Sequence, residues 1–369
     1  MLQQPPAQPG MREDAVDTPA LIVDLDAFEA NLDHMAGLVA AAGVRLRPHA
    51  KTHKSPVVAH LQAARGAVGQ CVQKVGEAEV LAWGGVPDIL VSNEVVDPAK
   101  LARLAALARI ARIGLCADDP RGVDAAAAAA ADAGVRLRVL VEIDAGGGRC
   151  GAAPGPDATA LARRIAASPH LIFGGIQAYH GLAQHLRTPE ERAAAVGAAV
   201  ERAGSVVEDL RRHGLACEVV TGAGTGSFAL EAASGVFTEL QAGSYVFMDA
   251  DYARNQAPPP FRQALFVLAG VMSAPRPGTA VVDAGHKAVA IDSGLPLVSG
   301  RQDVRYVAAS DEHGQLALDP GAEPLALGQR LRLVPGHCDP TVDRHDWYVG
   351  VRRGRVERLW PVAARGAMA

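Results

Sequence analysis

Hydrophobic and polar positions alternate between two patterns over residues 20–265. Short β-branched runs are separated by alanine-rich amphipathic stretches, such as 26–43, where Phe28, Leu32 and Met35 recur at helical spacing. About eight such strand–helix units predict parallel strands and favour an α/β barrel of the TIM-type (β/α)8 class over a doubly wound sheet. The predicted strands are 20–24, 44–50, 67–73, 88–93, 112–118, 136–144, 171–180, 217–223 and 238–245.

The pattern changes after a proline-rich joint, QAPPPFRQA, at 256–264. The chain beyond this joint has strands and turns with few helical stretches, among them TAVVDAG, VRYVAAS and QRLRLVPG. This pattern is typical of a mostly antiparallel β-domain. The sequence therefore predicts a barrel over 25–262 and a β-domain over 263–369.

Composition and charge narrow the classes of function. The chain has 369 residues, 49% of them apolar, and a formal net charge of −4 without a basic stripe, so we expect no nucleic-acid partner. No apolar run is long enough to span a bilayer, and no signal peptide is recognised. The five cysteines form no CxxC pair. Free thiols and a cytoplasmic location are the expectation.

Polar or glycine-rich motifs follow several predicted barrel strands, where barrel enzymes carry their chemistry. They are RPHAKTHK (47–54), EIDAGGGRCG (142–151), QAYHGLAQH (177–185), TGAGTGS (221–227) and QAGSYVFMD (241–249). TGAGTGS is either an ordinary turn or a cradle whose backbone N–H groups bind a phosphate. Lys51 is either a surface residue or, beside such a cradle, the lysine of a Schiff-base cofactor. Tyr179 and His180 are either core residues or cofactor contacts.

The predicted β-domain contains PGHCDPTVDRHD at 335–346. On a strand, His337 and Asp339 would point to the same side, and an imidazole with a carboxylate suits Mn, Zn or Mg. Cys338 would then lie on the opposite face and is not counted as a ligand. The alternative is a turn with a surface histidine and an aspartate.

Together, these motifs and DTPALIVDLDAFEANL resemble the D-threonine aldolase and D-serine dehydratase group. These are pyridoxal-phosphate enzymes with the alanine-racemase fold (fold-type III). The resemblance covers nearly the whole chain beyond the N-terminal tail. It implies a homodimer, and a β-domain to which the first strand, near 18–24, contributes.

The resemblance also implies roles for the residues at the predicted cofactor site. Lys51 matches the Schiff-base lysine, whereas Lys54 has no such role. Arg149 matches an arginine near the phenolic oxygen, and Tyr179 a tyrosine near the ring. Gln241 falls where alanine racemases have an arginine at the pyridine nitrogen, which would leave the ring unprotonated. The phosphate would be held by Gly224, Thr225, Gly226, Gly243, Ser244 and Tyr245.

For the reaction, the resemblance implies that His337 and Asp339 bind the metal. His185 and Asp311 fall where the substrate hydroxyl and the metal water would be contacted, and His185 is a candidate base. His49 and His53 are expected to support the site.

The predicted activity is cleavage of D-threonine and related β-hydroxy-D-amino acids to glycine and an aldehyde. The spacing His-x-Asp favours this aldolase over the alternative, a dehydratase acting on D-serine or 3-hydroxyaspartate, whose members tend to carry His-x-Cys. The carboxylate favours Mn or Mg, with Co or Zn as alternatives. Two further alternatives are a non-catalytic pyridoxal-phosphate carrier, which would not need the metal pair, and a metallohydrolase barrel, which would not need Lys51.

Overall fold

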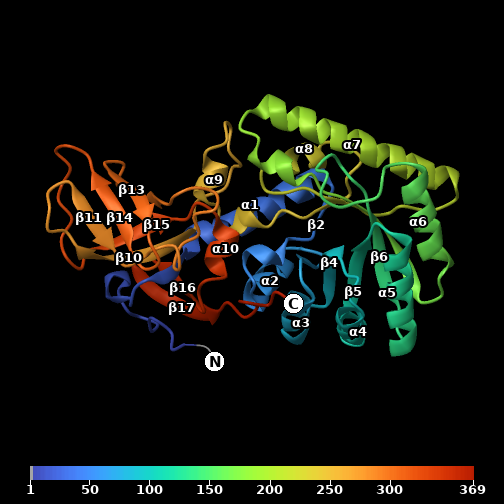
Figure 1. Cartoon of the computed structure of the whole chain (residues 1–369), viewed down its shortest axis with the longest axis horizontal. Coiled ribbons are helices and arrows are strands. Elements are labelled where there is room, and N and C mark those ends of the chain that lie inside the picture. Colours follow the sequence, from blue (N-terminus) through green and yellow to red (C-terminus); the bar gives the residue numbers. More distant parts are fainter. Residues whose placement is uncertain (1–2) are drawn as a thin grey trace.

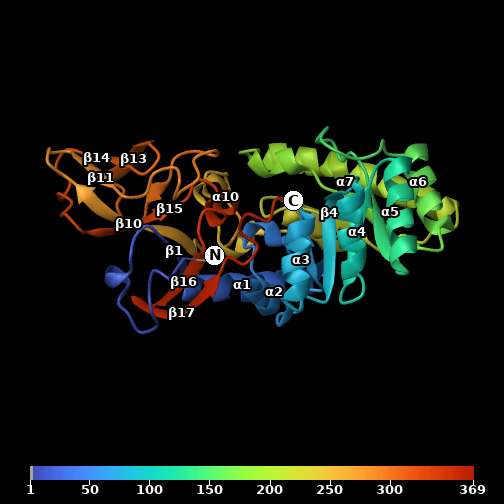
Figure 2. The same ribbon diagram turned by 60° about the horizontal axis from the view of Figure 1, so that its bottom comes forward.

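The computed structural model describes residues 3–369 and has two parts, an α/β barrel on the right of Figure 1 and a β-domain on the left. The predicted fold class, a barrel with a mostly antiparallel β-domain, is confirmed. Figure 2 shows the helices α3 to α6 on the outside of the barrel sheet. Within the described residues, no helix is both long and apolar enough to cross a membrane.

Eight parallel strands form the barrel in the order β2-β9-β8-β7-β6-β5-β4-β3. The Cys71 N–H closes the ring by donating to the Pro48 carbonyl at 2.8 Å, beside a bridge between His49 and Cys71. The strands predicted over 44–50 and 238–245 are shorter than expected, because the chain turns into the pocket after each. The barrel strands are β2 (Arg45–Leu46), β3 (Gln70–Val72), β4 (Asp88–Glu94), β5 (Arg112–Ala117), β6 (Leu137–Glu142), β7 (Leu171–Ala178), β8 (Val220–Gly222) and β9 (Glu239–Leu240).

The helices follow the predicted amphipathic stretches. In the first, the Asp24 carboxylate accepts the Ala27 N–H at 3.0 Å, and Gly43 ends the helix in the left-handed conformation. Phe28, Leu32 and Met35 are buried on its inner face, as expected. The α-helices are α1 (Leu25–Ala42), α2 (Pro56–Ala63), α3 (Val75–Trp83), α4 (Pro98–Leu107), α5 (Pro120–Ala133), α6 (Pro156–Ala167), α7 (Pro189–Arg212), α8 (Phe228–Ala232), α9 (Ala250–Ala253) and α10 (Cys338–Val342). Four 3-10 turns join them: η1 (Glu13–Ala15), η2 (Ala50–Thr52), η3 (Gly181–His185) and η4 (Ser244–Val246).

The β-domain is a nine-stranded sheet in the order β11-β14-β13-β12-β15-β10-β1-β16-β17, with β11 also pairing with β10. Its member β1, the first strand of the chain, runs antiparallel to β10 and parallel to β16. The chain therefore starts in this sheet, passes through the barrel and returns. The strands are β1 (Ala20–Asp24), β10 (Leu265–Ser273), β11 (Thr279–Val282), β12 (Leu297–Val298), β13 (Val304–Ala309), β14 (Gly314–Leu318), β15 (Arg330–Val334), β16 (Trp347–Arg352) and β17 (Arg355–Pro361).

The barrel floor, at the N-terminal ends of the strands, contains a buried ion-pair network. Arg47 donates to Asp88 at 2.6 Å and to Glu239 at 2.9 Å, and Arg138 donates to the same Asp88 at 2.7 Å. The side chains of Arg47, Asp88 and Glu239 are each no more than 5% exposed. Because buried charges are costly unless paired, this mutual pairing offsets the cost of burying them at the end of the barrel that carries no chemistry.

Candidate active site

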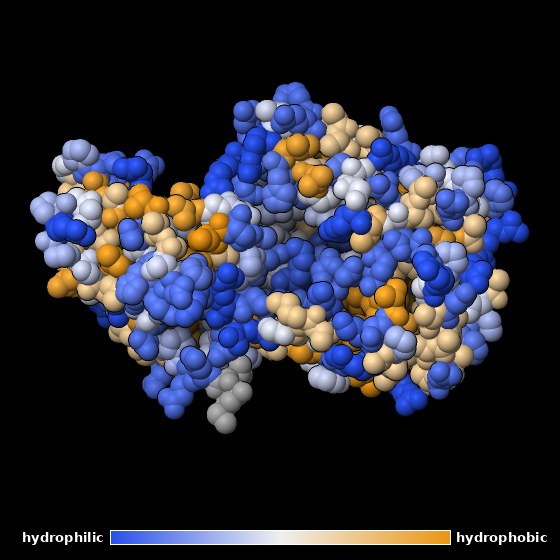
Figure 3. All heavy atoms as spheres, in the orientation of Figure 1, coloured by the Kyte–Doolittle hydropathy of each residue, from blue (hydrophilic) through white to orange (hydrophobic). Residues whose placement is uncertain are grey.

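A pocket opens at the opposite end of the barrel, where the C-terminal ends of the strands face α10 of the β-domain. Figure 3 shows a mostly hydrophilic, hollowed surface at the junction between the two parts. The pocket holds about 550 Å³ of space, counting its open mouth. Its lining residues are His49, Lys51, Thr52, Gln73, Ser92, Arg149, Gln177, Tyr179, Ala223, Gly224, Thr225, Gln241, Gly243, Ser244 and Tyr252.

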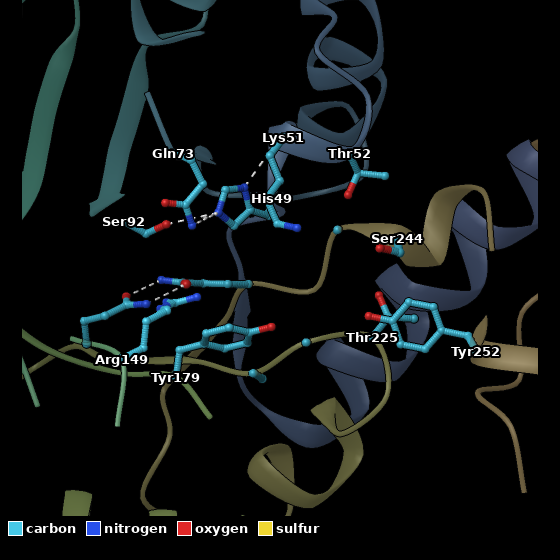
Figure 4. Close-up of a pocket in the computed structure, with 15 residues that line it drawn as sticks. His49, Lys51, Thr52, Gln73, Ser92, Arg149, Tyr179, Thr225, Ser244 and Tyr252 are labelled. Atoms are coloured by element: carbon cyan, nitrogen blue, oxygen red, sulfur yellow. Dashed lines mark hydrogen bonds between the residues drawn. The ribbon is translucent and has the colours of Figure 1, made fainter. Parts of the chain in front are cut away.

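Lys51 lies on the short turn η2 that comes after β2, and its side chain reaches into the pocket (Figure 4). Its ammonium forms an ion pair with the carboxylate of Asp339, at the start of α10. Burial alone would lower the pKa of Lys51, but Asp339 raises it above the ordinary value. The same pair holds the pKa of Asp339 well below its usual range, against the effect of burial. The pocket therefore joins a barrel lysine to a β-domain carboxylate 288 positions later in the chain.

His49 supports this turn, as expected. Its Nδ1 accepts the backbone N–H of Lys51 at 3.3 Å, and its Nε2 lies 3.1 Å from the Ser92 hydroxyl and 3.3 Å from Gln73. Burial holds its pKa well below the ordinary value, so the ring is neutral at pH 7. Because Nδ1 accepts, the proton lies on Nε2. His49 thus presents an uncharged ring to the pocket.

Arg149 comes from the glycine-rich loop after β6. The Asp144 carboxylate accepts the N–H groups of Gly146 at 2.8 Å and Gly148 at 3.0 Å, which shapes the loop. A side chain at Gly151 would meet the Ile143 backbone at 2.3 Å, so only glycine fits there. The Arg149 guanidinium carbon lies 5.6 Å from the centroid of the Tyr179 ring, and both residues line the pocket.

Gln241 and Gln177 form a reciprocal amide pair in the pocket wall. Gln177 Nε2 donates to Gln241 Oε1 at 3.0 Å, and Gln241 Nε2 donates back at 2.7 Å and to the Thr221 hydroxyl at 3.0 Å. The pair presents neutral amides, where an arginine would have placed a positive charge. This arrangement agrees with the expectation that a ring nitrogen here would not be protonated.

Two loops to which the sequence assigns a phosphate carry unpaired polar groups. The hydroxyls of Thr52 and Thr225 are buried and have no hydrogen-bond partner in residues 3–369. The backbone N–H groups of Thr225 and Gly243 also make no hydrogen bond within this range. A Cβ at Gly243 would meet the His49 carbonyl at 2.6 Å, so the loop requires glycine to pass so close to η2. Buried donors without partners are costly, and a bound phosphate would satisfy them.

The N–H groups of the glycines on either side of Thr225 donate to side chains of the protein. The Gly226 N–H donates to Gln184 Oε1 at 2.9 Å, and the Gly224 N–H points to the Ser227 hydroxyl at 3.4 Å. Ser227 in turn donates to the buried Glu231 at 2.8 Å. Burial raises the pKa of Glu231 to about 7. These contacts fix the loop on both sides of Thr225, whose own N–H makes no hydrogen bond in the described residues.

Six predicted site residues lie outside the pocket lining: Gly226, His337, Asp339, Tyr245, His185 and Asp311. The Tyr245 side chain is buried, packs on Phe261 and accepts a hydrogen bond from Gln62 at 3.1 Å. His185 is half-exposed, and its Nδ1 lies 2.7 Å from Asp251 on α9. Asp311 is exposed between β13 and β14 and pairs with His286 at 2.8 Å. The roles of these residues remain predictions.

The prediction that His337 and Asp339 lie on a strand is wrong. His337 is the N-cap of the helix α10, and Asp339 lies in its first turn. His337 Nδ1 lies 2.7 Å from Asp292, and Nε2 makes no hydrogen bond in the described residues. A metal-binding histidine commonly donates its other N–H to a carboxylate, and the contact of His337 with Asp292 has this form. Residues 3–369 contain no cluster of three or more His, Cys, Asp or Glu side chains that could hold a metal.

Several lining residues escaped prediction from the sequence: Thr52, Gln73, Ser92, Gln177, Ala223 and Tyr252. Thr52 and Gln177 lie inside the motifs RPHAKTHK and QAYHGLAQH, so strand-end position was a usable signal for both. Gln73 and Ser92 belong to no motif, and their signal is only their place at the ends of β3 and β4.

Comparison with known proteins shows which family this chain is similar to. The model for the alanine racemase N-terminal domain matches residues 23–251, and a serine dehydratase domain matches 264–351. The 3-hydroxy-D-aspartate aldolase of Paracoccus denitrificans (strain Pd 1222) is 50% identical over 98% of this chain and 95% of its own. The D-threonine aldolase of an Arthrobacter species is 49% identical over 98% and 96%.

The crystal structure of D-threonine aldolase from Filomicrobium marinum covers 100% of both chains, with 50% identity and a TM-score of 0.98. This chain belongs to the D-threonine aldolase group. It is therefore a carbon–carbon lyase with an alanine-racemase-like fold. The D-threo-3-hydroxyaspartate dehydratase of a Delftia species is more distant, at 36% identity over 88% of this chain and 92% of its own.

Membership of this family implies a pyridoxal-phosphate cofactor, and the residues of the pocket fit one. Lys51 supplies an amine at the pocket centre, and the unpaired groups of Thr52, Thr225 and Gly243 suit a phosphate. The cation of Arg149 suits a phenolate oxygen.

Proposed function

We propose that this lyase cleaves D-threonine and related β-hydroxy-D-amino acids to glycine and an aldehyde, with a divalent metal at His337 and Asp339. The observation that carries the proposal is the ion pair between Lys51 and Asp339 at the barrel mouth. The lysine amine suits a carbonyl cofactor, and the carboxylate suits a cation. The two residues come from different domains. The similarity to two aldolases over the whole chain supports the same activity.

In this proposal, Lys51 would bind the cofactor covalently, and Thr52, Thr225 and Gly243 would hold its phosphate. Pyridoxal phosphate bound there supplies the electron sink that breaking the bond between Cα and Cβ requires. A divalent cation held by His337 and Asp339 would lower the pKa of the substrate hydroxyl. Manganese suits this imidazole–carboxylate pair, with Mg, Co or Zn as alternatives.

His185 is the proposed base that removes the proton of the β-hydroxyl. Asp251 holds its Nδ1 at 2.7 Å, and Arg187 donates to the same carboxylate at 2.5 Å. The imidazole is thereby fixed with Nε2 as the acceptor. The proton taken from the hydroxyl would be returned to Cα as the aldehyde leaves, so that the products are glycine and the aldehyde.

We also propose that the enzyme is a cytoplasmic homodimer. In support, the five cysteines are all free within the described residues. Large apolar side chains such as Met272, Leu297 and Val307 are exposed on the β-domain, as at many subunit interfaces. Light scattering of the purified protein would test the dimer directly.

The activity is tested by separating the products of the two candidate reactions. An aldolase releases acetaldehyde and glycine from D-threonine, whereas a dehydratase releases ammonia and a 2-oxo acid from D-threonine or D-serine. We expect acetaldehyde and glycine in equal amounts, no turnover of L-threonine, and loss of cleavage on chelation that Mn²⁺ restores. Ammonia as the main product would favour the dehydratase, and full activity without metal would remove the metal from the proposal.

A further inference from the structure

Lys54, the last residue of the RPHAKTHK motif, is buried at the junction of the two domains. It is 6% exposed, and its ammonium lies 3.1 Å from Glu77 Oε1 and 3.0 Å from Asp343 Oδ1. Glu77 belongs to α3 of the barrel, and Asp343 is the C-cap of α10. One buried cation therefore joins the barrel to the helix that carries Asp339.

The C-terminal segment of the chain reinforces this junction. The Ala364 N–H donates to the Lys54 carbonyl at 2.9 Å, and the Gly366 N–H donates to Asp343 Oδ1 at 3.0 Å. Lys54 also has a φ of 48°, a left-handed conformation that is uncommon for a residue with a side chain. Such a conformation persists where the surrounding contacts hold it. The contacts here are the two carboxylates at the ammonium, the Ala364 N–H at the Lys54 carbonyl and the Ala50 carbonyl, which accepts the Lys54 N–H at 2.7 Å.

The two lysines of the turn therefore contact opposite ends of α10. Lys51 pairs with Asp339 in the first turn of the helix, and Lys54 pairs with Asp343 at its end. The helix packs directly against η2. A helix of five residues is not stable by itself, so its position depends on such contacts.

We propose that Lys54 is a positioning residue, which through Asp343 fixes where α10 presents Asp339 to the pocket. A cofactor bound covalently to Lys51 would engage the amine that pairs with Asp339. The ion pair between Lys54 and Asp343 does not involve Lys51. It would therefore still hold α10 against η2. As far as it concerns a metal at Asp339, this inference rests on the proposed function.

The test measures Mn²⁺ binding to the cofactor-loaded enzyme and to two variants, Asp343→Asn and Lys54→Met. The signal of free Mn²⁺ in electron paramagnetic resonance gives the dissociation constant without relying on activity. Visible absorbance reports the cofactor content. Asp343→Asn keeps the acceptor for Gly366 but loses the charge, so it is expected to fold even where Lys54→Met does not.

We expect Asp343→Asn to weaken Mn²⁺ binding on the order of ten-fold, the low end of the effect of groups that support metal ligands. Lys54→Met should act in the same direction, and the double variant should lose less than the sum of the two, because both remove one interaction. Cofactor content should stay at the wild-type level in every folded variant.

Arg332→Met is the matched control, because it removes another ion pair of the β-domain, with Glu13 at 2.5 Å, away from α10. It should lower the melting temperature and leave Mn²⁺ binding unchanged. A folded Asp343→Asn variant with the wild-type dissociation constant would overturn the positioning role alone. A wild-type enzyme that binds no Mn²⁺ would instead contradict the metal part of the proposed function, and the inference with it.

Discussion

The two ends of the barrel differ in whether their buried polar groups have hydrogen-bond or ion-pair partners. At the floor, Arg47 is fully paired with Asp88 and Glu239. At the mouth, the hydroxyls of Thr52 and Thr225 are buried without a partner in the described residues. Glu94, Glu142 and His180, which also lie at or just beyond the ends of barrel strands, each have a buried atom in the same state.

This difference shows which end is complete within the chain. Folding normally satisfies buried polar groups, and exceptions need an explanation. The floor needs nothing from outside, so its charges stabilise the fold. The mouth keeps buried donors without a partner in the described residues, so we expect its groups to serve binding. Substitutions at the two ends should therefore change different quantities.

The largest effect is expected at the floor. Arg47→Met leaves Asp88 and Glu239 buried without their shared cation, which should lower the free energy of unfolding by about 3–5 kcal/mol. Urea unfolding of the cofactor-free protein measures this loss. The folded fraction should retain cofactor as the wild type does. Weakened cofactor binding with unchanged stability would reverse the assignment of the two ends.

A smaller effect, dependent on pH, is expected behind the cradle at Glu231. Its pKa is raised by burial from 4.5 to about 7, so the folded state holds a proton that the unfolded state releases between these values. The stability from this group is present below about pH 4.5 and is lost as pH rises through 7, by roughly 3 kcal/mol.

Glu231→Gln keeps a polar group beside Ser227 but cannot ionise. Unfolding in urea at a series of pH values from about 5 to 8 should therefore show a flatter decline in stability than the wild type does. Parallel curves for the two proteins would mean that Glu231 does not titrate in this window.

The smallest effect is expected at the mouth, and stability and binding should move in opposite directions. Thr225→Val replaces an unpaired buried hydroxyl with a methyl group, so the cofactor-free protein should be as stable as the wild type, or more so. Cofactor binding should weaken by about 1.5–3 kcal/mol, the value of a hydrogen bond to a charged group. Equilibrium dialysis measures the second quantity and thermal unfolding the first. A cofactor-free variant less stable than the wild type would mean that Thr225 stabilises the fold, as the floor residues do.

Sequence patterns were sufficient to predict the barrel, the β-domain and most of the pocket. Lys51, Arg149, Tyr179 and Gln241 come after barrel strands, and the rule that chemistry lies at strand ends brings them together. The structure places all four in the lining. Their position in the pocket could be predicted because each depended on a motif and on the strand that precedes it, whereas their roles stay predictions.

Contacts between distant segments could not be predicted in this way. A five-residue helix such as α10 is too short for a periodic pattern, so the strand assignment around Asp339 was wrong. Lys54 lies three residues from Lys51, but its partners Glu77 and Asp343 come from different domains. Tyr245 lies in a cradle motif, and only the packing shows that its ring points into the core.

The most direct test of the account is to find which lysine binds the cofactor. Borohydride reduction of the pyridoxal-phosphate-loaded enzyme, with peptide mass spectrometry as the readout, should place the cofactor on Lys51 alone. Lys51→Ala should lose both the label and cleavage of D-threonine, while keeping the fold. Label on any other lysine, or an active Lys51→Ala variant, would contradict the claim that the unpaired groups of the barrel mouth form the cofactor site.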